Sequence, residues 1–250
     1  MRQGTLNSWT YPPAVLSLPE NEVHVWCASL NLPPDGLAKT IELLATDEVV
    51  RAARFRFKKD RDHFVIRRGL LRVILGCYLG IPPKKVEFTY NPFGKPAVSI
   101  NPEGFRFNLC HSGGLALIAV TRRGEIGVDL ERVRDDVEID ELSEGLFSEI
   151  EHDILRSLPP KVRLQAFFNC WTRKEAYLKA RGEGLSIPLS QFSVTVLPDE
   201  TPRLIGTQND PGENELWTLY HLSPGSEYIA AIAVEGKGHH LRLWTGENLV

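Results

Sequence analysis

Residues 170–185 read CWTRKEAYLKARGEGL, a stretch of helix-forming residues that ends in two closely spaced glycines. On a helix, Trp171, Glu175 and Lys179 follow one another at intervals of four residues and therefore share one face. The simplest interpretation is structural, because an exposed Glu175–Lys179 ion pair of that spacing contributes only about 0.3–0.5 kcal/mol. The glycines fix how the chain leaves the helix, which is unusual for a plain surface helix and favours a role in a site.

A second acidic stretch, IGVDLERV (126–133), has the composition of a β-strand. Asp129 and Glu131 lie two residues apart, so their side chains project from the same face of such a strand. Two adjacent carboxylates repel one another unless a cation lies between them, and oxygen ligands of this kind suit Mg²⁺. The alternative is an edge strand whose acids face water, and the short Asp-x-Glu pattern alone does not decide between the two.

The stretch FNLCHSGG (107–114) is typical of a strand that ends in a tight turn. Asn108 and His111 offer hydrogen-bond donors there, and the two glycines let a phosphate approach the backbone. A single histidine is more often structural, so this motif is ambiguous by itself. Just upstream, YNPFGKPAV (90–98) places Lys95 in a Gly-Lys-Pro turn, which presents one ammonium group on a stiff backbone.

Charge is unevenly distributed along this 250-residue chain, whose net charge is −3. Residues 51–72 contain nine Lys and Arg but two Asp, a local charge of +7, so the remainder is acidic. We interpret the basic segment as a site for an anionic ligand such as a polyphosphate, and we expect no nucleic-acid partner. A solvated helix face is the alternative. The longest apolar runs are strand-sized and too short to span a bilayer, so we expect no membrane association.

The four cysteines are scattered and show neither a metal-binding spacing nor a CxxC pair. We therefore expect free thiols in a reducing compartment. The N-terminal residues MRQGTLNSWTYPP lack the apolar segment of a signal peptide. Together these features predict a cytoplasmic protein.

The order of expected elements repeats along the chain. The first series has a strand at 22–30, a short helix at 35–45, a second short helix that Thr46 is expected to cap, a long helix from about residue 60, and strands at 86–90, 96–100, 105–110 and 115–120. The second series has a strand at 125–133, helices at 147–157 and 162–181, and strands at 192–197, 216–222 and 227–234. We therefore predict an α+β fold of two similar halves, residues 1–122 and 123–250. The cleft between the halves is the expected ligand site.

Taken in order, the basic helix, F-G-K-P, F-N-x-x-H-S, G-V-D-x-E and W-x-x-K-E-A-x-x-K-A-x-G-x-G-L resemble the 4′-phosphopantetheinyl transferase superfamily. The resemblance extends over residues 51–189, and the last two motifs are the most specific. Length and layout are similar to the Sfp-type, pseudodimeric branch; single-domain holo-acyl-carrier-protein synthases share only the last two motifs and form trimers. The resemblance implies the fold of this superfamily, with two halves in a pseudo-two-fold arrangement and the active site between them.

The resemblance also implies the reaction. Such an enzyme takes coenzyme A as substrate and moves its 4′-phosphopantetheine arm to a serine hydroxyl of an apo acyl or peptidyl carrier protein, releasing adenosine 3′,5′-bisphosphate. The implied cofactor is Mg²⁺, with Mn²⁺ as the alternative metal. Carriers of fatty-acid, polyketide, glycolipid and nonribosomal-peptide synthesis share this chemistry, and the motifs do not distinguish them. A monomer is implied because the second half takes the place of a partner subunit.

By motif, the resemblance assigns Asp129, Glu131 and Glu175 to the metal, and Glu175 and Lys179 to catalysis. It assigns coenzyme A binding to Arg51, Arg54, Lys95, Pro96, Cys110, His111 and Lys179. Glu175 is the expected base for the serine proton, with a metal-bound water as the alternative. Lys179 is expected to contact the phosphate and to assist the leaving group.

Two positions depart from the family pattern. Cys110 stands where the family usually has serine, and a thiol is a weaker hydrogen-bond donor than a hydroxyl. The family also often carries an arginine shortly after the aspartate of the basic helix. Here the sequence DRDHF offers both Arg61 and His63 for that place.

The resemblance places the acidic recognition helix of the carrier near residues 147–164. The side chains expected there are Phe147, Ile150, Leu155, Lys161 and Arg163. An amphipathic helix packed on its own half is the alternative interpretation of this segment.

Two other functions fit parts of the pattern. One is a catalytically inactive module that binds coenzyme A or a nucleotide, which the complete set of acids with Lys179 disfavours. The other is a Mg²⁺-dependent phosphohydrolase, but the motif set as a whole favours group transfer.

Overall fold

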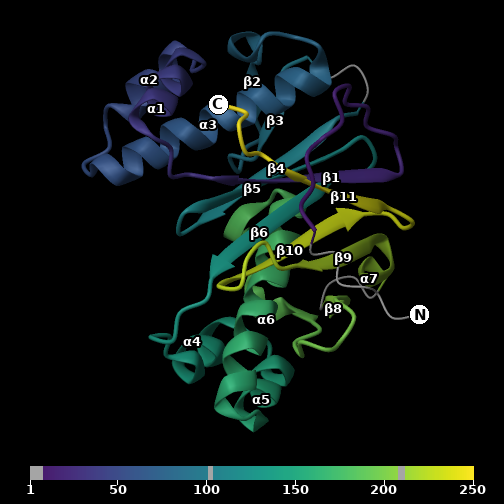
Figure 1. Cartoon of the computed structure of the whole chain (residues 1–250). Helices are drawn as coiled ribbons and strands as arrows, with labels where there is room; N and C mark the ends of the chain where they lie inside the picture. Colours follow the sequence, from purple (N-terminus) through teal and green to yellow (C-terminus); the bar gives the residue numbers. More distant parts are fainter. Residues whose placement is uncertain (1–7, 101–103, 208–211) are drawn as a thin grey trace.

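The structure is a computed structural model that describes residues 8–100, 104–207 and 212–250. It confirms the predicted α+β fold, in which two long helices cover the outer faces of two central sheets (Figure 1). The elements up to residue 121 are β1 (Glu22–Ser29), α1 (Pro34–Glu42), α2 (Thr46–Ala52), α3 (Lys58–Leu79), β2 (Phe88–Tyr90), β3 (Pro96–Val98), β4 (Arg106–Ser112) and β5 (Leu115–Thr121). Those that follow are β6 (Ile126–Arg132), α4 (Ile139–Leu146), α5 (Glu149–Ser157), α6 (Pro160–Arg181), β7 (Phe192–Val194), β8 (Leu204–Thr207), α7 (Glu213–Leu216), β9 (Trp217–Leu222), β10 (Tyr228–Glu235) and β11 (His240–Thr245).

The first sheet has the strand order β11-β1-β5-β4, with β5 antiparallel to both β1 and β4. Helix α3 lies on its outer face because apolar residues recur every three to four positions along the helix. Buried Leu70 and Ile74 belong to one core with Trp26 of β1 and Ile118 of β5. The helix ends where Gly80 adopts a left-handed conformation with φ of 66°.

The second sheet has the strand order β6-β10-β9, all antiparallel, and α6 covers its outer face. Strand β10 turns Ala231 and Ala233 toward this helix and Ile232 toward the other sheet. The small alanine side chains let α6 pack closely against the strands. This helix also ends at a left-handed glycine, Gly182, with φ of 69°.

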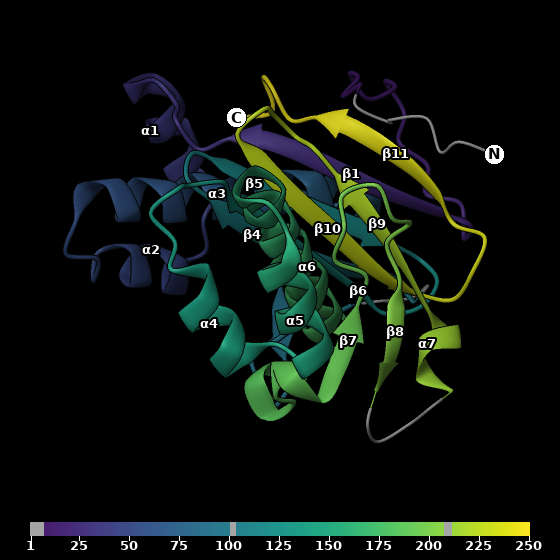
Figure 2. The same ribbon diagram turned by 90° about the horizontal axis from the view of Figure 1, so that it is seen from below.

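The inner faces of the two sheets pack against one another and form a third core (Figure 2). Val25 of β1 and Leu117 of β5 meet Val128 of β6 and Ile232 of β10 there. The layers are therefore α3, first sheet, second sheet and α6. Strands β4 and β6 face each other where the halves meet, so residues on these two strands are placed at the boundary.

Several details differ from the expectations. Strand β11 and helices α4 and α7 were not expected, and β11 runs parallel to β1 in the first sheet, far away along the sequence. The prediction that Thr46 caps α2 is wrong: Ala45 is the N-cap residue, and the Glu48 carboxylate accepts a hydrogen bond from its backbone N–H at 3.0 Å. The division into residues 1–122 and 123–250 stays a prediction.

All four cysteines are free thiols, as expected. Within the described ranges, no helix is both long and apolar enough to cross a membrane. The first seven residues, which belong to the N-terminal stretch considered above, lie outside the described residues.

Candidate active site

The G-V-D-x-E motif lies on β6 and the W-x-x-K-E-A-x-x-K motif on α6, and the two meet where this helix crosses the strand. Gly127 makes this crossing close, because a Cβ atom at that position would overlap backbone atoms of Ala176 and Ala180. Since side chains alternate along β6, Asp129 projects from the same face as Gly127, toward the helix. Its Oδ1 accepts a hydrogen bond at 2.5 Å from the Lys179 ammonium group of α6.

Asp129 is only 4% exposed, and its second carboxylate oxygen, Oδ2, is buried without a hydrogen-bond partner among the described residues. Burial alone would lower the pKa of Lys179, but Asp129 outweighs this effect and the net pKa lies above its ordinary value. Lys179 therefore stays protonated at neutral pH. A buried carboxylate oxygen without a partner is costly, so this atom is well suited to receive a further cation.

Two more carboxylates surround this pair. Burial and the charge of Asp129 raise the pKa of Glu131, whose carboxylate accepts a hydrogen bond of 3.0 Å from Ser112. Burial also raises the pKa of Glu175; Lys179 opposes the shift and Asp129 adds to it. The ion pair of Lys179 is thus with Asp129 rather than with Glu175.

The three acids do not form a ready coordination shell. In the described part of the chain, no three His, Cys, Asp or Glu side chains lie close enough together to hold one metal ion. The assignment of Asp129, Glu131 and Glu175 to a metal therefore stays a prediction. Carboxylate oxygens are the donors that Mg²⁺ prefers, and Oδ2 of Asp129 has no hydrogen-bond partner among the described residues.

A groove runs from Lys179 and Glu175 of α6 toward the β2–β3 hairpin. It is lined by Phe93, Gly94, Lys95, Pro96, Asn108, Leu109, Glu175, Leu178, Lys179, Gly182 and Gly184. The groove therefore joins the predicted residues Lys95, Pro96, Glu175 and Lys179 on one surface.

Lys95 is held at the end of α6. Its ammonium group donates to the Glu125 carboxylate at 2.7 Å and to the backbone carbonyl of Ala180 at 2.6 Å. Burial lowers the pKa of Lys95, an effect that Glu125 only partly offsets. Asn91 of the same hairpin donates to the backbone carbonyl of Gly182 at 2.7 Å, which fixes the hairpin to the helix end.

Cys110 and His111 point to opposite faces of β4, as successive residues of a strand must. The Cys110 side chain lies in the core between the two sheets, and burial raises its pKa. His111 lies on the side of α3 and keeps part of its surface exposed. The partial burial of its ring, with the nearby Arg67, His63 and Lys179, lowers its pKa to about 4. His111 is therefore neutral at pH 7 in the free protein.

The cluster around His111 includes an arginine that the sequence analysis missed. Arg67 lies with its guanidinium 5.6 Å from the centre of the Phe64 ring, and Arg51 contacts the same ring at 5.3 Å. Burial and the neighbouring Arg68 and Arg51 lower the pKa of Arg67 to about 10, and its Nε is buried without a partner among the described residues. The i, i+3 spacing from Phe64 could have indicated that Arg67 shares its face.

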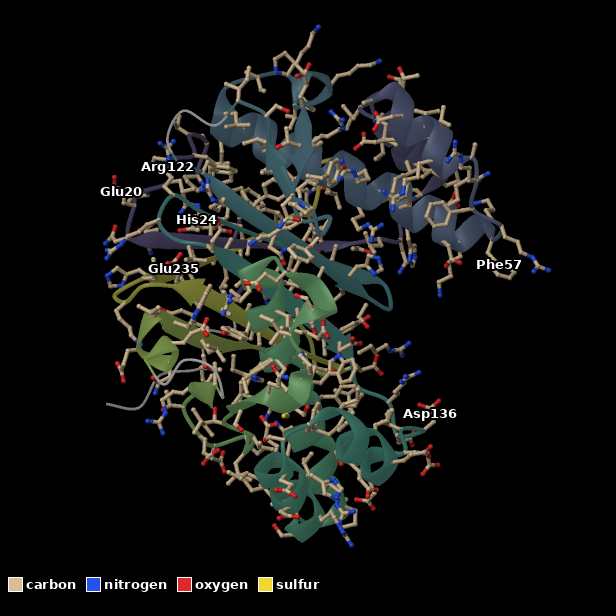
Figure 3. All side chains as sticks on the ribbon, turned by 180° about the vertical axis from the view of Figure 1, so that it is seen from behind. Glu20, His24, Phe57, Arg122, Asp136 and Glu235 are labelled. Carbon is tan, nitrogen blue, oxygen red and sulfur yellow. The ribbon has the colours of Figure 1, made fainter. Side chains whose placement is uncertain are left out.

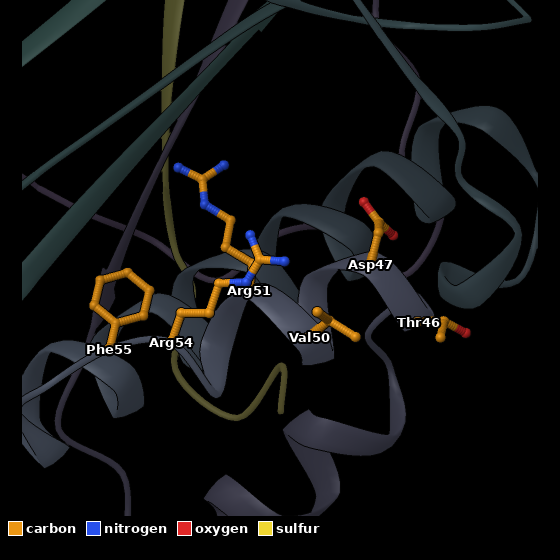
Figure 4. Close-up of a pocket in the computed structure, with 6 residues that line it drawn as sticks. All are labelled: Thr46, Asp47, Val50, Arg51, Arg54 and Phe55. Atoms are coloured by element: carbon orange, nitrogen blue, oxygen red, sulfur yellow. The ribbon is translucent and has the colours of Figure 1, made fainter.

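Arg51 and Arg54 both line a hollow on the surface of α2, shown in Figure 4. The other residues around it are Thr46, Asp47, Val50 and Phe55. Of the two alternatives on α3, His63 lies close enough to His111 to affect its pKa, whereas Arg61 pairs with Asp62 at 3.0 Å.

Two arginines of the basic segment are structural. Arg68 and Arg72 form buried ion pairs with Glu48 of α2, so they are not available to an anionic ligand. Two of the side chains expected to meet a carrier are not available to one, although docking of a carrier on residues 147–164 stays a prediction. Phe147 and Leu155 are buried in the core of the second half, whereas Ile150 is 65% exposed.

The chain is similar to known proteins over nearly its whole length. Residues 33–123 match the model of the N-terminal domain of 4′-phosphopantetheinyl transferases, and residues 125–233 match that of the 4′-phosphopantetheinyl transferase superfamily. The chain is 39% identical to the 4′-phosphopantetheinyl transferase HetI of Nostoc sp., with 95% of this chain and 98% of that protein covered. It is 30% identical to the 4′-phosphopantetheinyl transferase psf-1 of Bacillus pumilus, over 80% and 83% of the two chains.

Among solved structures, the holo-[acyl-carrier-protein] synthase of Thermotoga maritima aligns with 45% of this chain and 63% of its own length. The TM-score is 0.36 and the sequence identity 22%.

Proposed function

The chain belongs to the 4′-phosphopantetheinyl transferase superfamily, and from this premise we propose that it moves the 4′-phosphopantetheine arm of coenzyme A to a serine of a carrier protein. The acceptor is an apo acyl or peptidyl carrier protein, and adenosine 3′,5′-bisphosphate is released. One observation supports this function above all. The buried Asp129–Lys179 pair, with the carboxylates of Glu131 and Glu175 beside it, combines the charges that phosphoryl transfer requires.

We assign a Mg²⁺ ion, or alternatively Mn²⁺, to Asp129, Glu131 and Glu175. Two findings support this assignment: Oδ2 of Asp129 lacks a partner among the described residues, and burial together with the charge of Asp129 raises the pKa of Glu131. When bound, the metal neutralises charge on the pyrophosphate oxygens and polarises the phosphoryl group.

Glu175 is the base in this proposal. Its carboxylate lies in the groove beside Lys179, and a water held by the metal is the alternative proton acceptor. The serine oxygen forms a bond to the phosphorus that carries the pantetheine arm, and its proton passes to Glu175. The bond from that phosphorus to the bridging oxygen of the pyrophosphate breaks, and Lys179 stabilises the negative charge that remains on the leaving phosphate.

The residues that bind coenzyme A come from both halves in this proposal. Lys95 and Pro96 border the groove, and Lys179 connects the groove to the reacting phosphate. Arg51, Arg54 and His111 supply positive or proton-accepting groups at the α2–α3 side, and we add Arg67 because it lies beside Arg51 and His111. Cys110 supports this site from the core rather than through a direct thiol contact.

We further propose that the protein acts as a monomer in the cytoplasm. The groove that holds the proposed site is lined by residues of both predicted halves within one chain. The four free thiols are compatible with a reducing compartment.

The test combines the protein with coenzyme A, Mg²⁺ and several apo acyl and peptidyl carrier proteins, followed by intact-mass measurement of each carrier. We expect a mass increase of one phosphopantetheine group on at least one carrier, and loss of that product when Mg²⁺ is chelated. Binding of coenzyme A without any modified carrier would indicate an inactive binding module. Release of free phosphopantetheine without a carrier would instead indicate a hydrolase.

A further inference from the structure

Strands β4 and β6 lie side by side at the boundary between the halves, yet in the described part of the chain they are edge strands of different sheets with no backbone ladder between them. In Figure 3 this boundary passes between Phe57 and Asp136 on one side of the molecule. On the other side it passes between Arg122 and Glu235. Backbone N–H groups of β6 that point away from β10 therefore need acceptors other than a neighbouring strand.

Two side chains of β4 supply these acceptors. The side-chain carbonyl of Asn108 accepts a hydrogen bond of 2.9 Å from the backbone N–H of Val128. The hydroxyl of Ser112 accepts one of 3.0 Å from the backbone N–H of Arg132. Each pair is 20 residues apart along the chain, so both hydrogen bonds belong to one register between the strands. Both acids of the Asp-x-Glu pattern lie on β6 between these two hydrogen bonds.

The hydroxyl of Ser112 also contacts one of these acids directly. It donates to Oε2 of Glu131 at 3.0 Å, so it uses both its donor and an acceptor position. Glu131 is only partly buried and has three side-chain torsions, so its carboxylate would sample several positions without this contact. No other described residue donates a hydrogen bond to this carboxylate. Oε1 is therefore available to a cation while Oε2 is held.

The backbone of Ser112 is itself fixed by the second half. Gly113, which follows it, has a φ of 57°, and a Cβ there would lie 2.8 Å from Oη of Tyr228 and 3.1 Å from Cδ of Arg132. The backbone N–H of Gly114 donates to the same Oη at 3.2 Å. Tyr228 of β10 pairs with Arg132 in the ladder between β6 and β10. The turn after Ser112 thus packs directly against the strands that carry the acids.

We propose that Ser112 is a positioning residue, which holds the Glu131 carboxylate through Oε2 so that Oε1 can bind the metal of the active site. Asn108 supports this geometry because it keeps β6 in register with β4. The inference rests on the proposed function, in which Glu131 is a metal ligand. Loss of a side chain that orients a metal ligand typically weakens metal binding about 10–100-fold.

The experiment measures metal affinity without turnover. Mn²⁺ is titrated onto each protein in saturating coenzyme A without a carrier, and free Mn²⁺ is followed by electron paramagnetic resonance. We expect Ser112→Ala to raise the Kd for Mn²⁺ by about tenfold and Ser112→Thr, which keeps the hydroxyl, to stay within about threefold. In a Glu131→Gln background, Ser112→Ala should change this Kd by less than about twofold, because the hydroxyl acts through that carboxylate.

The matched control removes a strand hydroxyl far from the acids. Thr218 of β9, the opposite edge of the second sheet, donates to the backbone carbonyl of Gly236 at 2.6 Å. Thr218→Val should leave the Kd for Mn²⁺ within about twofold. Urea unfolding of the metal-free proteins then separates stability from metal affinity. If Ser112→Ala does not fold, Ser112→Cys takes its place and should raise the same Kd, because a thiol is a weaker donor than a hydroxyl.

Several outcomes would overturn the proposal. One is a Ser112→Ala protein that is less stable but binds Mn²⁺ as tightly as the wild type, or more tightly. Another is an equal loss of affinity in the Glu131→Gln background, which would show that Ser112 does not act through Glu131. A wild type that binds no Mn²⁺ would overturn it together with the metal assignment. A wild type that binds Mn²⁺ with coenzyme A but modifies no carrier would count against the proposed function alone.

Discussion

Helices α3 and α6 each span 22 residues, follow a short helix whose third residue is a glutamate, and end at a left-handed glycine. Counted back from Gly80 and Gly182, the eighth residue is Arg72 in one helix and Lys174 in the other. Both are buried, and both pair with the glutamate of the preceding short helix. The shared pattern is thus a scaffold that holds each long helix to its half.

The same count reveals where the halves differ. The seventh and third residues before the glycine are Val73 and Cys77 in α3, but Glu175 and Lys179 in α6. The first half instead carries exposed bases and His111. In the proposed function, one half therefore supplies the reacting acids and the other supplies the positive charge for the ligand, while both long helices keep the same scaffold.

The largest effect expected from this difference comes from Glu175→Gln. Removal of the base should reduce kcat on the order of 10³-fold, while the Kd for coenzyme A changes by less than about threefold. Single-turnover transfer and calorimetric titration separate the two quantities. Glu144→Gln, an exposed position on α4, serves as the control. Transfer at the wild-type rate in the Glu175 variant would remove this residue from its role.

The scaffold itself is tested by Glu48→Gln and Glu151→Gln. Glu48→Gln leaves Arg68 and Arg72, and Glu151→Gln leaves Lys174, without a carboxylate partner. Loss of one partner of a buried ion pair typically lowers the free energy of unfolding by about 3–5 kcal/mol. Urea unfolding should therefore show comparable losses in both halves, whereas the exposed Glu141→Gln should change stability by less than about 0.5 kcal/mol. A large loss in one half alone would mean that the two halves do not share this device.

Much of this arrangement follows local rules that act on the sequence. The apolar spacing predicted both long helices, and strand alternation placed Asp129 and Glu131 on one face. Their approach to Lys179 was inferred only through the family resemblance, because it depends on the packing of α6 over Gly127. That glycine is the one local signal of a close helix–strand contact.

Other features depend on contacts between distant segments. Arg67 meets Arg51 across two helices, and β11 finds its partner β1 at the other end of the chain. Alternation could have indicated that Cys110 and His111 face opposite ways. Which of them faces the core is determined by the second sheet, which no local pattern describes.

The two terminal glycines provide a matched pair of smaller effects. Both have positive φ, so alanine at either position costs about 1–2 kcal/mol of stability. A Cβ at Gly80 meets nothing, whereas one at Gly182 would lie 2.7 Å from Cδ of Lys95. We expect Gly182→Ala to raise the Kd for coenzyme A by about fivefold and Gly80→Ala to leave it unchanged, as measured by calorimetry. If both variants bound coenzyme A with equal affinity, the present position of the Lys95 side chain would not be required for coenzyme A binding.

The smallest expected effect concerns one proton on the ligand-binding half. The pKa of His111 is about 4 in the free protein, so the imidazole is neutral at pH 7. A coenzyme phosphate nearby raises this pKa, so binding takes up a proton and affinity increases as the pH falls from about 8 to about 5.5. Calorimetry in buffers of different ionisation enthalpy should detect this uptake in the wild type and a smaller one in His111→Asn. His221 of the second half also has a pKa of about 4, caused by burial and Arg173, so His221→Asn should retain the full uptake. Equal uptake in all three proteins would place the proton on another group and remove His111 from contact with the coenzyme.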